Sequence, residues 1–153
     1  MNGAFTESRV QRRLQDALYV EAMLLADEAR SYFDEGSRVE REALPPMARV
    51  AFSCESLKVT TRLMHAIAWL LTQRAVAAGE LRPCEALDPA RRLGTAPMSD
   101  AESLAEMPTG ARRLIDASID LHRRVARLDA LQEREMAAVS PARSMQQRLA
   151  LAF

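Results

Sequence analysis

The sequence of 153 residues contains few cysteines, few glycines and few aromatic side chains. Its two cysteines, Cys54 and Cys84, do not form a CxxC pair and are too few for a disulfide framework. Five glycines, four phenylalanines and two tyrosines are also a poor composition for a β-sandwich, whose strands favour aromatic and β-branched residues. The sequence therefore excludes a disulfide-stabilised fold and argues against an all-β fold.

Long apolar runs and an excess of one charge are also absent. No stretch of about 18 apolar residues is present, so the sequence predicts no membrane-spanning helix. The first residues, MNGAFTESRVQRRLQ, lack the apolar centre of a signal peptide. The 21 basic and 21 acidic side chains give a net charge of zero, whereas nucleic-acid binding needs a concentrated basic face. We therefore expect a protein of the reducing cytoplasm that binds neither a membrane nor nucleic acid.

Motifs for catalysis and metal binding are missing as well. A di-iron site in a helical bundle needs Glu three residues before His, but Arg62 and Ile119 stand in that position before His65 and His122. No Gly-rich phosphate loop, G-x-S-x-G or acidic metal motif is present. We predict no catalytic residue, no metal and no cofactor, and we expect function to depend on surfaces that contact other proteins.

Three long stretches carry apolar residues at three- and four-residue spacing, which predicts amphipathic helices. They cover roughly 8–35, 46–78 and 111–137. Gly79 follows the second stretch as a candidate helix cap. Three rods of similar length, each with an apolar face, predict an all-α fold: an antiparallel three-helix bundle over residues 1–137.

The main interruption of this pattern is a Pro-rich loop over residues 80–100, between the second and third helices. Ser99 and Glu102 predict a capping box for a short helix over 100–107. A second irregular segment, residues 138–153, contains Pro141 and is predicted to be a flexible C-terminal tail.

The second helix carries two apolar seams. Each recurs at three- and four-residue spacing, so the helix is expected to pack against two neighbours, and Cys54 is expected to be a small core residue. One seam is Val50, Cys54, Leu57, Thr61, Met64, Ala68, Leu71 and Ala75; the other is Phe52, Ser56, Val59, Leu63, Ala66 and Leu70.

The remaining sector of this helix is predicted to point outward, although it holds the only tryptophan of the chain. Tryptophan and arginine are enriched at the energetic centres of protein interfaces, so this ridge is a candidate protein-interaction site. Three alternatives remain open for Trp69: the loop over 81–98 covers it, another helix of the chain covers it, or a partner protein does. The candidate residues are Lys58, Arg62, His65, Trp69 and Gln73.

The C-terminal tail is a second candidate for protein interaction. Leu149, Leu151 and Phe153 are apolar residues near a free C-terminus. An unfoldase could engage such a tail, or the tail could dock in a groove of a partner. The alternative is a frayed end without function.

Three blocks of the sequence resemble one known family. They are YVEAMLLADEARSYFDE at 19–35, FSCESLKVTTRLMHAIAWLLTQRAVAAGE at 52–80 and, less specifically, HRRVARLDALQ at 122–132. Together they resemble the RcdA family, regulators of CtrA degradation in alphaproteobacteria, over about residues 10–135. The resemblance implies a dimeric three-helix bundle that delivers cargo, including cell-cycle regulators, to the ClpXP protease together with CpdR and PopA. It supplies no catalytic or cofactor-binding residues and assigns no role to the ridge.

The missing catalytic motifs and the resemblance thus favour a non-enzymatic adaptor that binds different partners through different surfaces, and the resemblance implies that it works as a homodimer. Binding two partners at once raises the effective concentration of cargo at the protease. Two alternatives stay open. One is a helical bundle that binds a small molecule or metal, as a sensor or enzyme, and the other is a structural oligomer without a link to proteolysis.

Overall fold

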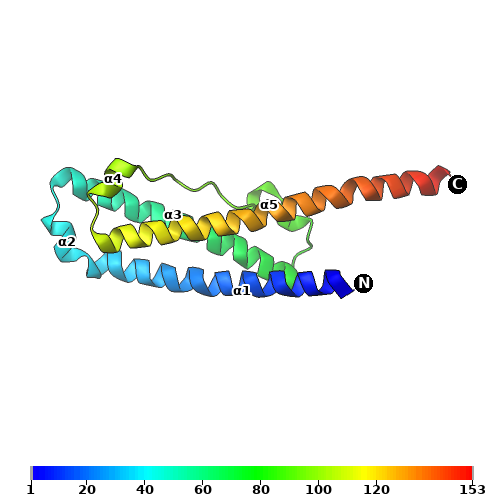
Figure 1. Ribbon diagram of the computed structural model, residues 1–153, viewed down its shortest axis with the longest axis horizontal. Helices are drawn as coiled ribbons and strands as arrows, with labels where there is room; N and C mark the ends of the chain where they lie inside the picture. Colours follow the sequence, from blue (N-terminus) through cyan, green and yellow to red (C-terminus); the bar gives the residue numbers. More distant parts are fainter. Residues whose placement is uncertain (1, 153) are drawn as a thin grey trace.

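The computed structural model describes residues 2–152, with side chains described over 7–138, 145–146 and 148–152. All regular secondary structure in residues 2–152 is helical, which confirms the all-α class (Figure 1). The chain begins with α1 (Asn2–Ser31), which passes into a π-helical turn, η1 (Tyr32–Gly36), and then into the short α2 (Arg38–Ala43). Two long helices follow, α3 (Pro46–Ala77) and α5 (Thr109–Ala152).

The corner between α1 and α2 is held by a wide turn. The backbone N–H of Ser37 donates to the carbonyl of Tyr32 at 2.8 Å, which closes the π-helical ring. The Tyr32 hydroxyl donates to the Glu40 carboxylate at 2.8 Å, and burial together with this bond raises the pKa of Tyr32 to about 12. The bond therefore ties α2 back to the end of the first helix.

Helix α3 has the ends that the sequence indicates. Pro46 lies in its first turn, where a missing N–H costs nothing because no intrahelical acceptor is available. Gly79 follows its end with a left-handed φ of 77°, and the Glu80 N–H donates back to the Ala75 carbonyl at 2.9 Å. Gly79 is thus the helix cap that the sequence predicts.

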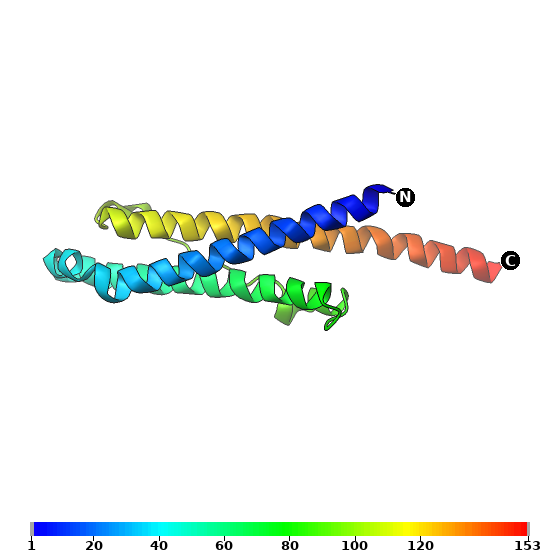
Figure 2. The same ribbon diagram turned by 90° about the horizontal axis from the view of Figure 1, so that it is seen from below.

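Helices α3 and α5 run in the same direction, and α1 runs against both (Figures 1 and 2). Side-chain pairs along the two helices advance together: Arg62 with Ser118, Trp69 with Asp129, and Gln73 with Gln132. The prediction of a wholly antiparallel bundle is therefore wrong for this pair. Parallel neighbours require a connection that returns along their length, and residues 78–108 provide it.

This connection, here called the crossover, is mostly irregular. It contains two short 3-10 turns, η2 (Glu85–Leu87) and η3 (Pro89–Arg91), then an extended stretch, and the short α4 (Ala101–Ala105). Asp100, rather than Ser99, caps α4 by accepting from the N–H of Glu102 at 3.4 Å. The predicted capping box at Ser99 is wrong because the Ser99 hydroxyl binds side chains of α3 instead.

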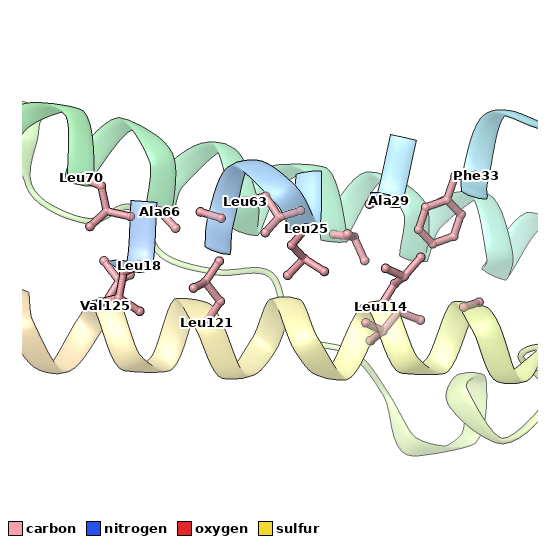
Figure 3. Close-up of a cluster of buried hydrophobic side chains, with 14 of the residues drawn as sticks. Leu18, Leu25, Ala29, Phe33, Leu63, Ala66, Leu70, Leu114, Leu121 and Val125 are labelled. Carbon is pink, nitrogen blue, oxygen red and sulfur yellow. The ribbon is translucent and has the colours of Figure 1, made fainter. Parts of the chain in front are cut away.

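The hydrophobic core lies where α1, α3 and α5 meet (Figure 3). Leu18 of α1 lies near Leu70 and Val125, and Phe33 lies at the opposite end near Leu114. From α3 the core takes the second of the two seams: Phe52, Val59, Leu63, Ala66 and Leu70 are all at most 3% exposed. Burying a side chain of this size stabilises the fold by about 1.5–3 kcal/mol.

Helix α5 is longer than the sequence pattern predicts. It continues from Thr109 to Ala152, whereas the sequence predicts that the helix ends near 137 and that an irregular tail follows. Ala, Leu, Met, Gln and Arg dominate the last residues and have high helix propensity, which here outweighs the loss of one backbone donor at Pro141. The prediction of a non-helical tail over 138–152 is therefore wrong.

Candidate functional site

The ridge of α3 that was predicted to face outward instead faces α5 and the crossover. Arg62, Trp69 and Gln73 are 1%, 2% and 4% exposed, while Lys58 and His65 are partly exposed. The prediction of an outward ridge is wrong because the crossover returns over the α3–α5 junction and covers it. Of the three open alternatives for Trp69, burial by another helix holds, because its side chain is 2% exposed and its indole binds Asp129 of α5.

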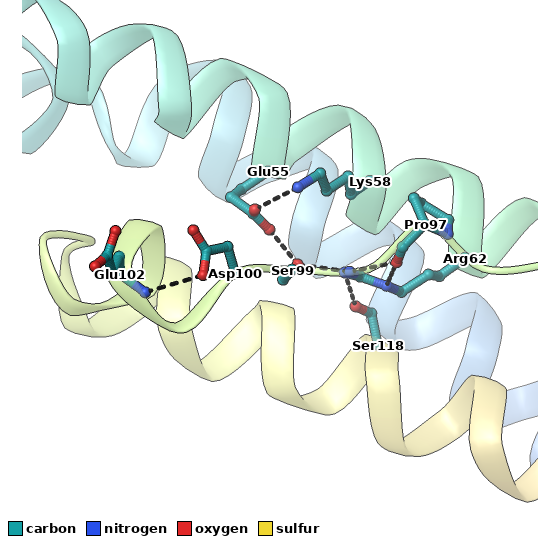
Figure 4. Close-up of polar contacts among 8 residues, drawn as sticks. All are labelled: Glu55, Lys58, Arg62, Pro97, Ser99, Asp100, Glu102 and Ser118. Carbon is teal, nitrogen blue, oxygen red and sulfur yellow. Dashed lines mark hydrogen bonds and ion pairs between the residues drawn. The ribbon is translucent and has the colours of Figure 1, made fainter.

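Arg62 is the centre of a polar network under the crossover (Figure 4). Its Nη2 donates to the Pro97 carbonyl at 2.9 Å and to the Ser99 hydroxyl at 2.6 Å, and its Nη1 donates to the Ser118 hydroxyl at 3.3 Å. The Ser99 hydroxyl in turn donates to Glu55 at 2.5 Å. Burial lowers the pKa of the Arg62 guanidinium, and the Glu55 charge opposes this shift. Arg62 thereby joins α3, α5 and the crossover at one point.

A second anchor lies two turns further along α3. The indole Nε1 of Trp69 donates to Oδ1 of Asp129 on α5 at 2.9 Å. Arg92 of the crossover binds both oxygens of the same carboxylate, at 2.8 and 2.9 Å, and also reaches Glu133 at 3.1 Å. These bonds raise the pKa of Arg92 above its usual value. The bidentate geometry fixes the crossover at this end.

Between the two anchors, the crossover backbone passes close to two histidines. Nε2 of His122 lies 3.0 Å from the Gly94 carbonyl oxygen, and a Cβ at Gly94 would lie only 2.6 Å from Nδ1 of His65. A side chain at position 94 would therefore collide with the imidazole ring. Neither histidine belongs to a metal-type cluster, since residues 2–152 hold no group of three His, Cys, Asp or Glu side chains placed to bind a metal ion.

Sequence reasoning named Arg62 and Trp69 but placed them on the outside, and it gave Glu55 and the other residues of these anchors no part in a site. Glu55, Arg62 and Trp69 recur every seven residues along α3, and this spacing was a usable signal for a third buried face. Arg92, Ser99 and Asp129 carry no such signal, because their roles depend on how the crossover returns. All of these residues fix the fold, so the ridge contributes little free surface.

The exposed surface of α3 is instead its first apolar seam, here called the α3 stripe. Val50, Leu57, Met64 and Leu71 are 57%, 69%, 59% and 47% exposed, and Cys54 is also exposed. The prediction that Cys54 is a core residue is wrong, because α1 and α5 pack on the other sides of the helix. The α3 stripe comprises Val50, Cys54, Leu57, Thr61, Met64, Ala68, Leu71 and Ala75.

The C-terminal candidates lie on α5 beyond the region that contacts α1 and α3 (Figures 1 and 2). Leu149 and Leu151 are 56% and 89% exposed. Phe153 lies outside the described residues. The two leucines therefore belong to a projecting helix and not to an extended tail.

Comparison with known proteins places the chain in a family. The family model described as "Protein of unknown function (DUF1465)" matches residues 6–153. The chain belongs to the DUF1465 family. No curated protein matches it.

A solved structure links this DUF1465 protein to RcdA. The crystal structure of RcdA from Caulobacter crescentus CB15 matches with 33% sequence identity and a TM-score of 0.65. The match covers 78% of this chain and 90% of the RcdA chain. This confirms the resemblance to the RcdA family that the three sequence blocks indicated.

Proposed function

We propose that this protein is a non-enzymatic adaptor that delivers cell-cycle regulatory proteins, CtrA-like response regulators among them, to the ClpXP protease. The observation that carries the proposal is the likeness to RcdA, with 33% identity over 90% of that chain. On this proposal the protein makes and breaks no covalent bonds itself. Its partners are ClpXP, CpdR-like and PopA-like regulators and protein cargo, and it acts as a homodimer in the cytoplasm.

Two exposed apolar surfaces support an adaptor role. The α3 stripe lies along the bundle, and Leu149 and Leu151 lie on the projecting end of α5. One surface can join two copies of the chain while the other stays free, so a homodimer presents two α5 ends and can hold two partners at once, which raises the local concentration of one partner at the other. None of the helices described within residues 2–152 contains an apolar stretch of membrane-spanning length.

The test is a reconstituted degradation assay with ClpXP, CpdR-like and PopA-like proteins and a panel of cell-cycle regulators. The full-length protein is expected to accelerate degradation of at least one cargo several-fold. If no cargo in the panel is degraded faster, the adaptor proposal fails.

A matched pair of variants tests the projecting end of α5. Leu151→Ser and Met98→Ser each remove an apolar side chain that is 89% exposed, one on α5 and the other on the crossover. If the α5 end binds the protease or cargo, Leu151→Ser slows delivery while Met98→Ser does not. Equal rates for both variants would remove the α5 end from the proposal.

A further inference from the structure

The exposed α3 stripe has an unusual distribution of side-chain sizes. Its eight positions alternate at four- and three-residue spacing, which is the a/d pattern of a coiled-coil seam. The d positions hold the large residues Val50, Leu57, Met64 and Leu71. The a positions hold the small residues Cys54, Thr61, Ala68 and Ala75.

This alternation makes the stripe complementary to itself when it is reversed. In an antiparallel helix pair, each a position of one helix meets a d position of the other. Leu57 would then meet the partner's Ala68, and Thr61 would meet the partner's Met64. The outer layers follow the same rule, with Cys54 against the partner's Leu71 and Val50 against the partner's Ala75. Each layer thus combines one large and one small side chain, as close packing requires.

A parallel pair would not pack in this way. Like positions would face each other, so Leu57 would meet a second Leu57 and Ala68 a second Ala68. The layers of large residues could pack, but the layers of Ala68 and Ala75 would leave voids, which cost stability. The sizes therefore select the antiparallel arrangement.

The residues that flank the stripe permit the close approach of a second helix. On one side lie Ala51, Lys58, His65 and Thr72, and on the other Ser53, Thr60, Ile67 and Arg74. No acidic residue is present among them. The two cations are already engaged within the protomer, since Lys58 binds Glu55 at 2.9 Å and Arg74 stacks 4.4 Å over the Tyr19 ring.

A groove of about 260 Å³ between α1 and α3 opens beside the same stripe, and it is lined by Met64 of the stripe and by Thr60 of its flank. In the reversed pairing, Ile67 of the partner subunit lies next to Thr60, at the mouth of this groove. The apolar contact would therefore extend beyond the helix seam itself. From Val50 to Ala75 the seam is about 37 Å long, at about 1.5 Å per residue.

We infer that the α3 stripe is a homodimer interface in which two copies of α3 pack antiparallel about a two-fold axis between Thr61 and Met64. A second copy fits better than an unrelated helix, because the alternation of large and small residues matches its own reverse at all eight positions. This inference deepens the proposed homodimer by naming its surface and geometry. It requires neither protease nor cargo, so its tests are independent of the degradation assay.

The first test measures molecular mass by light scattering across a dilution series. The wild-type protein is expected to have a molecular mass of twice 17.0 kDa, the mass of one chain. Leu57→Glu places a carboxylate against the partner's Ala68 and is expected to raise the dissociation constant at least about a hundredfold, because an unpaired buried charge is costly. Val39→Glu is the matched control, since Val39 is 81% exposed on α2 and away from the stripe. Circular dichroism confirms that both variants keep their helical content.

A second test reads the direction of the two helices. Both natural cysteines, Cys54 and Cys84, are first changed to serine. Chains carrying Leu57→Cys are then mixed with differently tagged chains carrying Ala68→Cys and oxidised. The antiparallel interface predicts cross-links between the two kinds of chain, whereas a parallel interface predicts cross-links between two Leu57→Cys chains.

Three results would overturn the inference. One is a measured molecular mass of 17.0 kDa, that of a single chain, for the wild-type protein at every concentration. Another is a dimer that Leu57→Glu leaves intact, which would place the interface elsewhere and leave the stripe for a different protein. The third is cross-linking confined to pairs of identical variants.

Discussion

The indole nitrogen of Trp69 donates a 2.9 Å hydrogen bond to Oδ1 of Asp129, which lies sixty residues further along the chain. The same carboxylate accepts both hydrogen bonds of the Arg92 fork. One side chain of α5 therefore holds both α3 and the crossover. This arrangement explains why an aromatic residue lies among charged residues on α3: its apolar ring is buried and its one polar atom has a partner.

Removing this carboxylate should destabilise the fold. Asp129→Ala leaves the Trp69 N–H without an acceptor and the Arg92 guanidinium with Glu133 alone, and the Arg92 side chain is only 25% exposed. We expect a loss of about 2–4 kcal/mol in the free energy of unfolding, measured by urea denaturation. The control is Asp120→Ala, because Asp120 is 56% exposed and binds Arg124 on the surface of the same helix. That change should cost less than about 1 kcal/mol, and equal losses for both variants would contradict the proposed role of Asp129.

The Arg62 network should control how firmly the crossover is held. Arg62→Met keeps much of the side-chain volume but removes the donors to Pro97, Ser99 and Ser118. We expect faster amide hydrogen exchange over residues 92–100 while the middle of α3 keeps its protection, because local opening costs less than global unfolding. Exposed Arg112→Met on α5 is the control and should leave the exchange rates unchanged. Uniform acceleration along the whole chain would show that Arg62 stabilises the entire fold rather than the crossover.

Gly94 should be required because of its contact with His65 and not because of its backbone angle. Its φ is not in the left-handed region, but a Cβ would lie 2.6 Å from the His65 ring. Gly94→Ala should therefore cost about 1–3 kcal/mol of stability. In a protein that already carries His65→Ala, adding Gly94→Ala should cost much less stability than it does in the wild type. A Cβ at Gly36 would meet no atom closer than 3.5 Å, so Gly36→Ala serves as the neutral control.

The sequence predicted the ends of α3 and its core-facing seam well. Pro46 and Gly79 bound α3 as expected, and the seam that contains Val59 and Leu63 forms the core. These features depend on local backbone preferences and on one apolar face, which a single sequence displays directly. The family blocks were equally informative, since the match to RcdA confirms them.

The orientation of α3 could not be predicted in the same way. The helix carries two apolar seams and a third face that includes Glu55, Arg62 and Trp69, so hydrophobicity alone assigns the third face to solvent. In the structure the polar groups of that face have partners from distant parts of the chain: Ser99 binds Glu55, and Asp129 binds the Trp69 indole. Only the direction of α5, set by the length of the crossover, brings these partners into reach. The apolar α3 stripe was left outside for the same reason.

The pH dependence of stability provides a last prediction, which concerns His122. Burial lowers the pKa of His122 below the usual 6.5, helped by the nearby His65 and Arg62 and opposed by the bond to the Gly94 carbonyl. The unfolded chain therefore binds this proton more readily than the folded chain does. The stabilising contribution of the neutral ring is fully present above about pH 6.5 and is lost as the pH falls through the lower, folded-state pKa.

Urea midpoints measured between pH 8 and pH 5 should fall more steeply for the wild type than for His122→Gln, which keeps an amide donor near Gly94. The carboxylates are common to both proteins, so the difference between the two curves isolates the imidazole. Parallel curves would mean that His122 takes up its proton equally well in the folded and unfolded states, and that the crossover does not exclude water from it.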